Sequence, residues 1–305
     1  MKLNDLCFEI IKACPNQCLF CSSCSSPNAN EIISLELYKK TIDRFMELGV
    51  IEELSISGGE PLLHPNIIEI INYAKNLGIK VILYTSGICK MVNNNYSGIP
   101  REIIDILKAI GLDKIVFDLQ TINEDNYNYL MGTKNFLPYV LQSIARVTVV
   151  GIPAEIHFIP LKTNQNDLKD ILEIAELGIE RVRLLRFIPQ GRGLENANDL
   201  MLSNEEISNF IANIHNYNFK IDIREGVHLL EEDTHKCTAG LGKFVIRYDG
   251  KLLPCPAFKD CDEETLRACG LKDININSDD DYEIKFSNGT RVKPLCKQLK
   301  RTELK

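Results

Sequence analysis

The chain has 305 residues, of which 45% are hydrophobic and 25% charged, and its formal net charge is −7. This acidic balance argues against nucleic acid as a partner, because nucleic-acid-binding surfaces are usually basic. The sequence contains no run of about 18 apolar residues, which a membrane span would need, and we recognise no export signal at the N-terminus. We therefore expect a cytoplasmic protein, in which the eleven cysteines indicate metal binding or catalysis rather than disulfides.

Segments with helical periodicity, most of them ending at a glycine, alternate with short runs rich in Ile, Val, Leu and Phe. Ser34 and Asn66 are the expected N-caps of the first two helices. The predicted strands cover residues 6–11, 53–57, 80–85, 114–120, 154–160 and 181–188. This alternation predicts an α/β protein with a parallel sheet, and six units favour a partial (β/α)6 TIM-like barrel. A flat doubly wound sheet remains an alternative.

The pattern changes after residue 188. Ser203 and Glu206 form a capping box that predicts a further helix. Asp249-Gly250 between two apolar runs predicts a β-hairpin. Because five cysteines follow residue 220, we predict a barrel domain over 1–219 and a small, cysteine-rich α+β extension over 220–305, held together by metal.

The first predicted strand is followed by the sequence CPNQCLFC, which contains Cys14, Cys18 and Cys21. Thiolates are the usual ligands of iron–sulfur clusters, and this short spacing lets one loop wrap a cluster. Three cysteines leave one iron open to bind another group, and Phe20 can shield the cluster from water. Cys24 keeps two alternatives open, a closed electron-transfer cluster with four ligands and a zinc knuckle.

The second predicted strand ends in Ser57-Gly58-Gly59-Glu60-Pro61. Ligands of parallel sheets bind beyond the carboxyl ends of the strands. Paired glycines let a substrate approach the backbone closely, and a neighbouring carboxylate can bind an ammonium group. A tight turn with a surface Glu is the alternative for this sequence alone, but the cysteine loop one strand earlier favours a binding site.

Together, these two motifs, CPNQCLFC and the sequence from Gly58 to Pro61, resemble those of the radical S-adenosylmethionine (radical SAM) superfamily, and the resemblance covers about residues 5–195. It implies a [4Fe–4S] cluster on Cys14, Cys18 and Cys21, whose open iron binds the amino and carboxylate groups of S-adenosylmethionine. Gly58, Gly59 and Glu60 would contact the amino group. In this family, one electron from the cluster releases a 5′-deoxyadenosyl radical, which abstracts hydrogen from a substrate.

The same resemblance implies further contacts to S-adenosylmethionine at the ends of later strands. Ser86 lies where the family often has a Thr-Asn-Gly-like strand end. Asp118 and Gln120 lie where members commonly contact the ribose. Ile188, in the sequence RFIPQGRG, lies near the expected adenine position. Phe20 completes the predicted cofactor-binding set.

The C-terminal cysteines resemble the auxiliary-cluster modules known as SPASM and its shortened form, twitch. Cys237 is followed by Gly250 and then by Cys255, as in the opening of both modules. The resemblance implies one auxiliary [4Fe–4S] cluster on Cys237, Cys255, Cys296 and either Cys261 or Cys269. Cys261 is favoured because Cys269 lies in a helix-like run.

These features predict a radical SAM enzyme that modifies a ribosomally made peptide, with flavodoxin or ferredoxin as the electron donor. One alternative keeps this chemistry and acts on a cofactor precursor, a sugar or a nucleotide. An alternative from another class is an iron–sulfur electron carrier or redox sensor. The Gly58-Gly59-Glu60 sequence argues against the last, because neither function needs a site for the cofactor's amino group.

Overall fold

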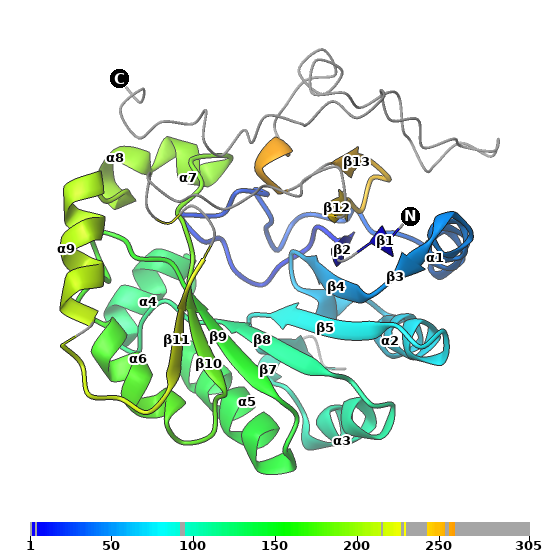
Figure 1. The fold of residues 1–305 in the computed structure, drawn as a ribbon, viewed down its shortest axis with the longest axis horizontal. Coiled ribbons are helices and arrows are strands. Elements are labelled where there is room, and N and C mark those ends of the chain that lie inside the picture. The colour runs from blue at the N-terminus through cyan, green and yellow to red at the C-terminus, as the bar shows by residue number, and fades with distance from the viewer. Residues whose placement is uncertain are drawn as a thin grey trace.

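The computed structural model describes residues 2–3, 5–91, 95–214, 216–226, 229, 243–253 and 256–259. Within these ranges, nine strands form one sheet in the order β11-β10-β9-β8-β5-β4-β2-β12-β13, parallel except for the β12–β13 pair. The sheet curves, with helices along its outer side (Figure 1). This α/β arrangement with a mostly parallel sheet is consistent with the expected partial barrel.

The strands of the large sheet are β2 (Asp5–Ile11), β4 (Glu53–Gly58), β5 (Lys80–Thr85), β8 (Lys114–Asp118), β9 (Ala154–Phe158), β10 (Arg181–Leu184), β11 (Asp222–Glu225), β12 (Lys243–Ile246) and β13 (Leu252–Leu253). Two small pairs are β1 (Lys2–Leu3) with β3 (Val50–Ile51), and β6 (Ile88–Lys90) with β7 (Tyr96–Gly98). The helices are α1 (Leu35–Leu48), α2 (Ile67–Asn76), α3 (Arg101–Ala109), α4 (Glu124–Met131), α5 (Leu137–Val150), α6 (Leu168–Ala175), α7 (Arg192–Glu195), α8 (Ala197–Leu200) and α9 (Asn204–Ile214), with 3₁₀ turns η1 (Pro61–Leu63) and η2 (Pro256–Phe258). None of the helices in the described ranges is long and apolar enough to cross a membrane.

Helix α1 shows how the sequence produces this architecture. Its N-cap is Ser34, whose Oγ accepts a hydrogen bond from the Leu37 N–H at 3.1 Å. Tyr38, on the buried face, packs against Phe8 of β2 with ring centroids 5.2 Å apart. Full burial of such a side chain stabilises the fold by about 1.5–3 kcal/mol. The Tyr38 hydroxyl also donates to the Ile70 carbonyl of α2, which ties two neighbouring helices together.

The two faces of the sheet differ in chemistry. On the outer face, alternate strand residues are apolar and almost fully buried under the helices; examples are Ile56, Leu83, Phe117 and Phe158. The intervening positions of β8, β9 and β10 face the concave side and are largely charged or polar. This polar concave side distinguishes the sheet from a closed barrel, whose interior is filled mainly by branched apolar residues.

All six predicted strands are present, as β2, β4, β5, β8, β9 and β10, but β11 of the same sheet was not predicted, and three of the six end earlier than expected. The structure ends β8 at Asp118, β9 at Phe158 and β10 at Leu184. Beyond the ends of β8 and β9, side-chain hydrogen bonds replace the backbone hydrogen bonds between the two strands. The Gln120 Oε1 accepts from the Ile159 N–H at 2.8 Å, and its Nε2 donates to the His157 carbonyl at 3.2 Å.

The chain after residue 219 contributes to the same sheet. Strand β11 pairs with β10, and β12 pairs with β2, both in parallel. The predicted hairpin is confirmed as the antiparallel β12–β13 pair, and the predicted capping box is present at the start of α9. The proposed boundary between two domains at residue 219 therefore stays a prediction. Three strands that follow it, β11, β12 and β13, belong to the main sheet. Cys237, Cys255, Cys261, Cys269 and Cys296 lie outside the described residues.

Candidate active site

The cysteine loop follows the carboxyl end of β2 and leads into α1 (Figure 1). Cys14 and Cys18 are buried, and Cys21 is half-buried. The end of α4 fixes the loop's path, because the Leu19 N–H donates to the Leu130 carbonyl at 2.9 Å. The Gln17 N–H likewise donates to the carbonyl of Met131, the last residue of α4, at 2.9 Å. Three thiols are thus presented from one loop that is anchored on a neighbouring helix.

A second anchor comes from the segment that follows β10. The Arg192 Nε donates to the Cys18 carbonyl at 2.9 Å, and its Nη2 donates to the Ser25 carbonyl at 2.7 Å. The Asn196 Nδ2 donates to the Leu19 carbonyl at 3.2 Å. Nothing in the local sequence marks Arg192 or Asn196 as residues that hold the cysteine loop, which is 167 to 177 residues away along the chain. The available signal was the RFIPQGRG sequence, which suggested only an adenine contact.

Cys24 differs from the three other cysteines of this segment. It is exposed, and its φ of 49° places it in the left-handed region. A Cβ added at Gly191 would lie 2.8 Å from the Cys24 Sγ and 2.9 Å from the Cys21 carbonyl oxygen. Gly191 therefore allows the segment after β10 to pack directly against the cysteine loop.

The Gly58-Gly59 pair is required by close backbone packing. The Gly59 N–H donates to the Ile11 carbonyl at 2.7 Å, and the Glu60 N–H donates to the Ala13 carbonyl at 2.8 Å. A Cβ at Gly59 would lie 2.2 Å from the Ala13 oxygen, and one at Gly58 would lie 2.3 Å from the Ile11 oxygen. In this structure the glycines bring the turn after β4 against the base of the cysteine loop.

Glu60 is fully buried and binds the end of β5. Its Oε1 accepts from the Thr85 hydroxyl at 2.7 Å and from the Leu62 N–H at 3.0 Å. Its Oε2 accepts from the Ser86 N–H at 2.7 Å and from the Ser86 hydroxyl at 2.6 Å. Burial raises the pKa of Glu60, and the Ser86 and Thr85 donors oppose this rise. Since four donors already surround the carboxylate, Glu60 acts here as a positioning residue; its contact to an ammonium group stays a prediction.

The two buried thiols of the loop would become thiolates only with a cation bound to them. Burial raises the pKa of Cys14 and of Cys18, and the neighbouring acidic groups add to this rise. Buried thiolates therefore need a bound cation, which the iron ions of a cluster supply. No three Cys, His, Asp or Glu groups among the described residues gather as ligands of one metal ion. The assignment of individual ligands therefore rests on the loop and its chemistry.

The predicted cofactor contacts beyond the loop lie at neighbouring strand ends. Asp118 ends β8, and Gln120 is fully buried just beyond it. Their side chains are hydrogen-bonded, with the Gln120 Nε2 as donor. Phe20 is buried, whereas Ile188 is half-buried. The backbone carbonyl of Ile188 lies 3.0 Å from where a Cβ at Gly193 would be, so this segment packs closely on itself.

Asp118 leads to a pH-dependent prediction. Burial raises the pKa of Asp118 to about 6, and its hydrogen bond from Gln120 opposes this rise. If the ionised carboxylate accepts hydrogen bonds from ribose hydroxyls, affinity for S-adenosylmethionine should fall about tenfold per pH unit well below pH 6. Equilibrium dialysis of the anaerobic, cluster-loaded protein measures this dependence. The affinity of the Asp118→Asn variant for S-adenosylmethionine should not fall in this way below pH 6. The same fall in that variant would contradict the role of Asp118 in binding the ribose.

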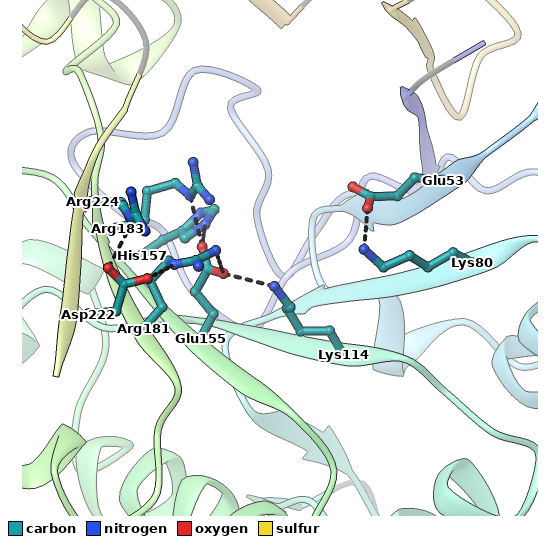
Figure 2. Close-up of polar contacts among 9 residues, drawn as sticks. All are labelled: Glu53, Lys80, Lys114, Glu155, His157, Arg181, Arg183, Asp222 and Arg224. Atoms are coloured by element: carbon teal, nitrogen blue, oxygen red, sulfur yellow. Dashed lines mark hydrogen bonds and ion pairs between the residues drawn. The ribbon is translucent and has the colours of Figure 1, made fainter. Parts of the chain in front are cut away.

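A charged network lies on the concave side beside this site (Figure 2). Glu155 of β9 is almost completely buried at its centre. It pairs with Lys114 at 3.0 Å, Arg183 at 2.8 Å, His157 at 3.2 Å and Arg181 at 3.7 Å. Burial alone would raise the pKa of Glu155, but its partners, first of all His157 and Arg183, lower it well below its usual range.

The network is continuous with the predicted ribose-binding position. Asp118, His157, Arg183 and Arg224 are paired in register on β8, β9, β10 and β11. Side chains in one such row share a face of the sheet. Asp222 binds Arg224 at 2.8 Å and also contacts Arg181 at the same distance. The wall of the concave side next to Asp118 is therefore built from interlocked ion pairs.

The sheet carries three thiols on one loop beyond its strand ends. The turn that contains the buried Glu60 carboxylate lies next to this loop. These features define a candidate iron–sulfur enzyme. Comparison with known families is more specific, because the Radical SAM superfamily matches residues 8–178. The chain belongs to this superfamily, which implies a [4Fe–4S] cluster and S-adenosylmethionine.

The chain is also similar to individual proteins. It is 26% identical over 281 residues to the PqqA peptide cyclase of Xanthomonas campestris pv. campestris (strain B100), covering 87% of this chain and 71% of that protein. It is 27% identical to the PqqA peptide cyclase of Methylorubrum extorquens (strain PA1), covering 82% of this chain and 65% of that protein.

Among solved structures, Streptococcus suis SuiB bound to the precursor peptide SuiA has a TM-score of 0.71 at 17% identity, over 86% of this chain and 61% of SuiB. The structure of anSMEcpe with bound AdoMet and the Cp18Cys peptide has a TM-score of 0.60 at 14% identity, over 82% of this chain and 73% of that one. These likenesses show a shared fold. The chain spans about three fifths of SuiB and about two thirds of the Methylorubrum cyclase.

Proposed function

We propose that this protein is a radical SAM enzyme that modifies a peptide. The observation that carries the proposal is the meeting of three elements at the strand ends: the thiol loop, the Gly58–Glu60 turn and Asp118. The hydrogen bond from the Glu60 N–H to the Ala13 carbonyl joins the turn directly to the loop. In the partial barrel that we propose for residues 1–219, the cluster and the cofactor would lie on the concave side.

Individual residues of the chain have distinct proposed roles. Cys14, Cys18 and Cys21 would hold the [4Fe–4S] cluster, with Phe20 excluding water from it. The reduced cluster supplies the electron that cleaves S-adenosylmethionine and thereby generates the radical that abstracts hydrogen from the substrate.

The remaining proposed roles concern binding and orientation. The backbone at Gly58 and Gly59 would contact the amino group of the cofactor. Glu60 would keep Ser86 in place through its two hydrogen bonds to that residue. Asp118 and Gln120 would bind the ribose, and the backbone around Ile188 would lie near adenine.

The names of the similar proteins support a peptide substrate. Two are PqqA peptide cyclases, and a third was solved with its precursor peptide. We further propose a twitch-like extension over residues 220–305 that carries a second [4Fe–4S] cluster. Its ligands would be Cys237, Cys255, Cys296 and Cys261, with Cys269 as the alternative fourth. The electron donor would be a flavodoxin or ferredoxin.

The substrate class can be tested by offering candidate compounds of each kind. Anaerobically reconstituted protein with dithionite and S-adenosylmethionine would be given short peptides encoded near its gene. Separate reactions would contain sugars or nucleotides. We expect one peptide to accelerate 5′-deoxyadenosine formation and to change in mass. Acceleration by a sugar or nucleotide alone would reject the peptide assignment while leaving the radical chemistry intact.

A further inference from the structure

Tyr127 of α4 has a buried hydroxyl that the proposed function does not yet use. Its side chain is 0% exposed, and its hydroxyl oxygen has no hydrogen-bond partner among the described residues. Burying a polar group without a partner costs free energy, so such atoms in native proteins usually bond to a group not yet accounted for. Tyr129, two residues later, is 52% exposed, so the burial is particular to position 127.

Tyr127 lies about one helical turn before the end of α4 that holds the cysteine loop. Leu130 and Met131 follow it by three and four residues, so all three share one face of α4. The carbonyls of Leu130 and Met131 accept the hydrogen bonds that hold the cysteine loop. The loop with the predicted cluster ligands is therefore held at the carboxyl end of α4, about one turn after the buried Tyr127 side chain.

The groups around the hydroxyl define what it can do. Burial, and then interactions with Cys18, Asp118, Cys14 and Glu60, raise the pKa of Tyr127, so its hydroxyl lies close to these groups. A phenol hydroxyl can donate one hydrogen bond, and a cluster on these cysteines would bring sulfur acceptors to this position.

We propose that the Tyr127 hydroxyl donates a hydrogen bond to a sulfur atom of the cluster held by Cys14, Cys18 and Cys21. The inference rests on the proposed ligand set and deepens it. Hydrogen bonds to cluster sulfurs help to set the reduction potential, because they stabilise the more negative, reduced state. Tyr127 would therefore make the cluster easier to reduce.

The test compares Tyr127→Phe with Tyr129→Phe as a matched control on the same helix. Both full-length variants are reconstituted anaerobically, and cluster reduction is followed by EPR in a redox titration without S-adenosylmethionine. We expect Tyr127→Phe to retain the wild-type iron content and to show a more negative midpoint potential. Tyr129→Phe should match the wild type. An unchanged potential in Tyr127→Phe would overturn the proposal.

Two further measurements separate this role from others. In thermal unfolding of the cluster-free protein, Tyr127→Phe should be at least as stable as the wild type, because it removes an unpartnered hydroxyl. A lower melting temperature would mean that the hydroxyl has a structural partner and would contradict the proposal. Weaker binding of S-adenosylmethionine with an unchanged potential would assign the bond to the cofactor instead. A wild-type protein that assembles no cluster would reject the proposed function itself.

Discussion

Replacing any one of Cys14, Cys18 and Cys21 by alanine should abolish 5′-deoxyadenosine formation. Each variant removes one of only three thiolates that we propose as cluster ligands, and no fourth protein ligand compensates. Cys14 and Cys18 are buried in a loop whose backbone is fixed by α4 and Arg192, so another side chain cannot easily take their place. Iron content, EPR of the reduced protein and product analysis would all report the loss.

Cys24→Ala is the matched control from the same loop. Cys24 is exposed, and alanine removes its thiol while keeping the Cβ, so the substitution should leave the surrounding packing unchanged. This variant should assemble the first cluster and form product at a rate close to that of the wild type. Loss of the cluster in Cys24→Ala would instead favour a closed, four-cysteine site. That outcome would favour the electron-carrier hypothesis.

Glu155→Gln should cause the largest loss of stability among single substitutions on the concave side. The carboxylate is almost completely buried and pairs with Lys114, Arg181 and Arg183 (Figure 2). Breaking a buried ion pair by removing one partner leaves uncompensated charge and typically costs about 3–5 kcal/mol. Because the partners here are partly exposed, we expect a loss of about 3 kcal/mol in the free energy of unfolding.

Denaturant unfolding of the cluster-free protein measures this loss, with Glu53→Gln as the control. Glu53 pairs with Lys80 at 2.8 Å, apart from the Glu155 network, and the Lys80 side chain is 51% exposed. Exposed pairs of this kind are worth about 0–1 kcal/mol. Equal effects of the two substitutions would contradict the central place of Glu155.

The pH dependence of this stability has a definite sign. The pKa of Glu155 is lower in the folded protein than its ordinary value of 4.5. Its contribution is therefore fully present above about pH 4.5 and is lost as pH falls through the lower, folded value. The difference between wild type and Glu155→Gln should shrink below pH 4.5. A difference that grows on acidification would mean that another group controls the network.

The sequence allowed six of the nine strands of the sheet and the cysteine loop to be predicted, because both depend on local patterns. Short apolar runs between helical segments indicate parallel strands, and closely spaced cysteines indicate one metal-binding loop. Ser34 was likewise recognisable as an N-cap, because capping depends on residues only three apart. Strand ends were less predictable, since the side chain of Gln120 ends the ladder between β8 and β9.

Contacts between distant parts of the chain could not be predicted, because local sequence patterns do not show them. Arg192 binds the Cys18 carbonyl across 174 residues, and Glu60 binds Ser86 across 26. The Glu155 network joins four strands whose charges appear in the sequence as ordinary surface residues. The close packing of Gly59 on Ala13 also depends on the fold. From the sequence, that glycine pair suggested only room for a substrate.

The most direct test of the central claim is anaerobic reconstitution of the wild-type chain, followed by reduction with dithionite in the presence of S-adenosylmethionine. The account predicts a [4Fe–4S] signal by EPR and formation of 5′-deoxyadenosine and methionine, both lost in Cys18→Ala. A protein that assembles and reduces its cluster but forms no 5′-deoxyadenosine with any reductant would contradict it.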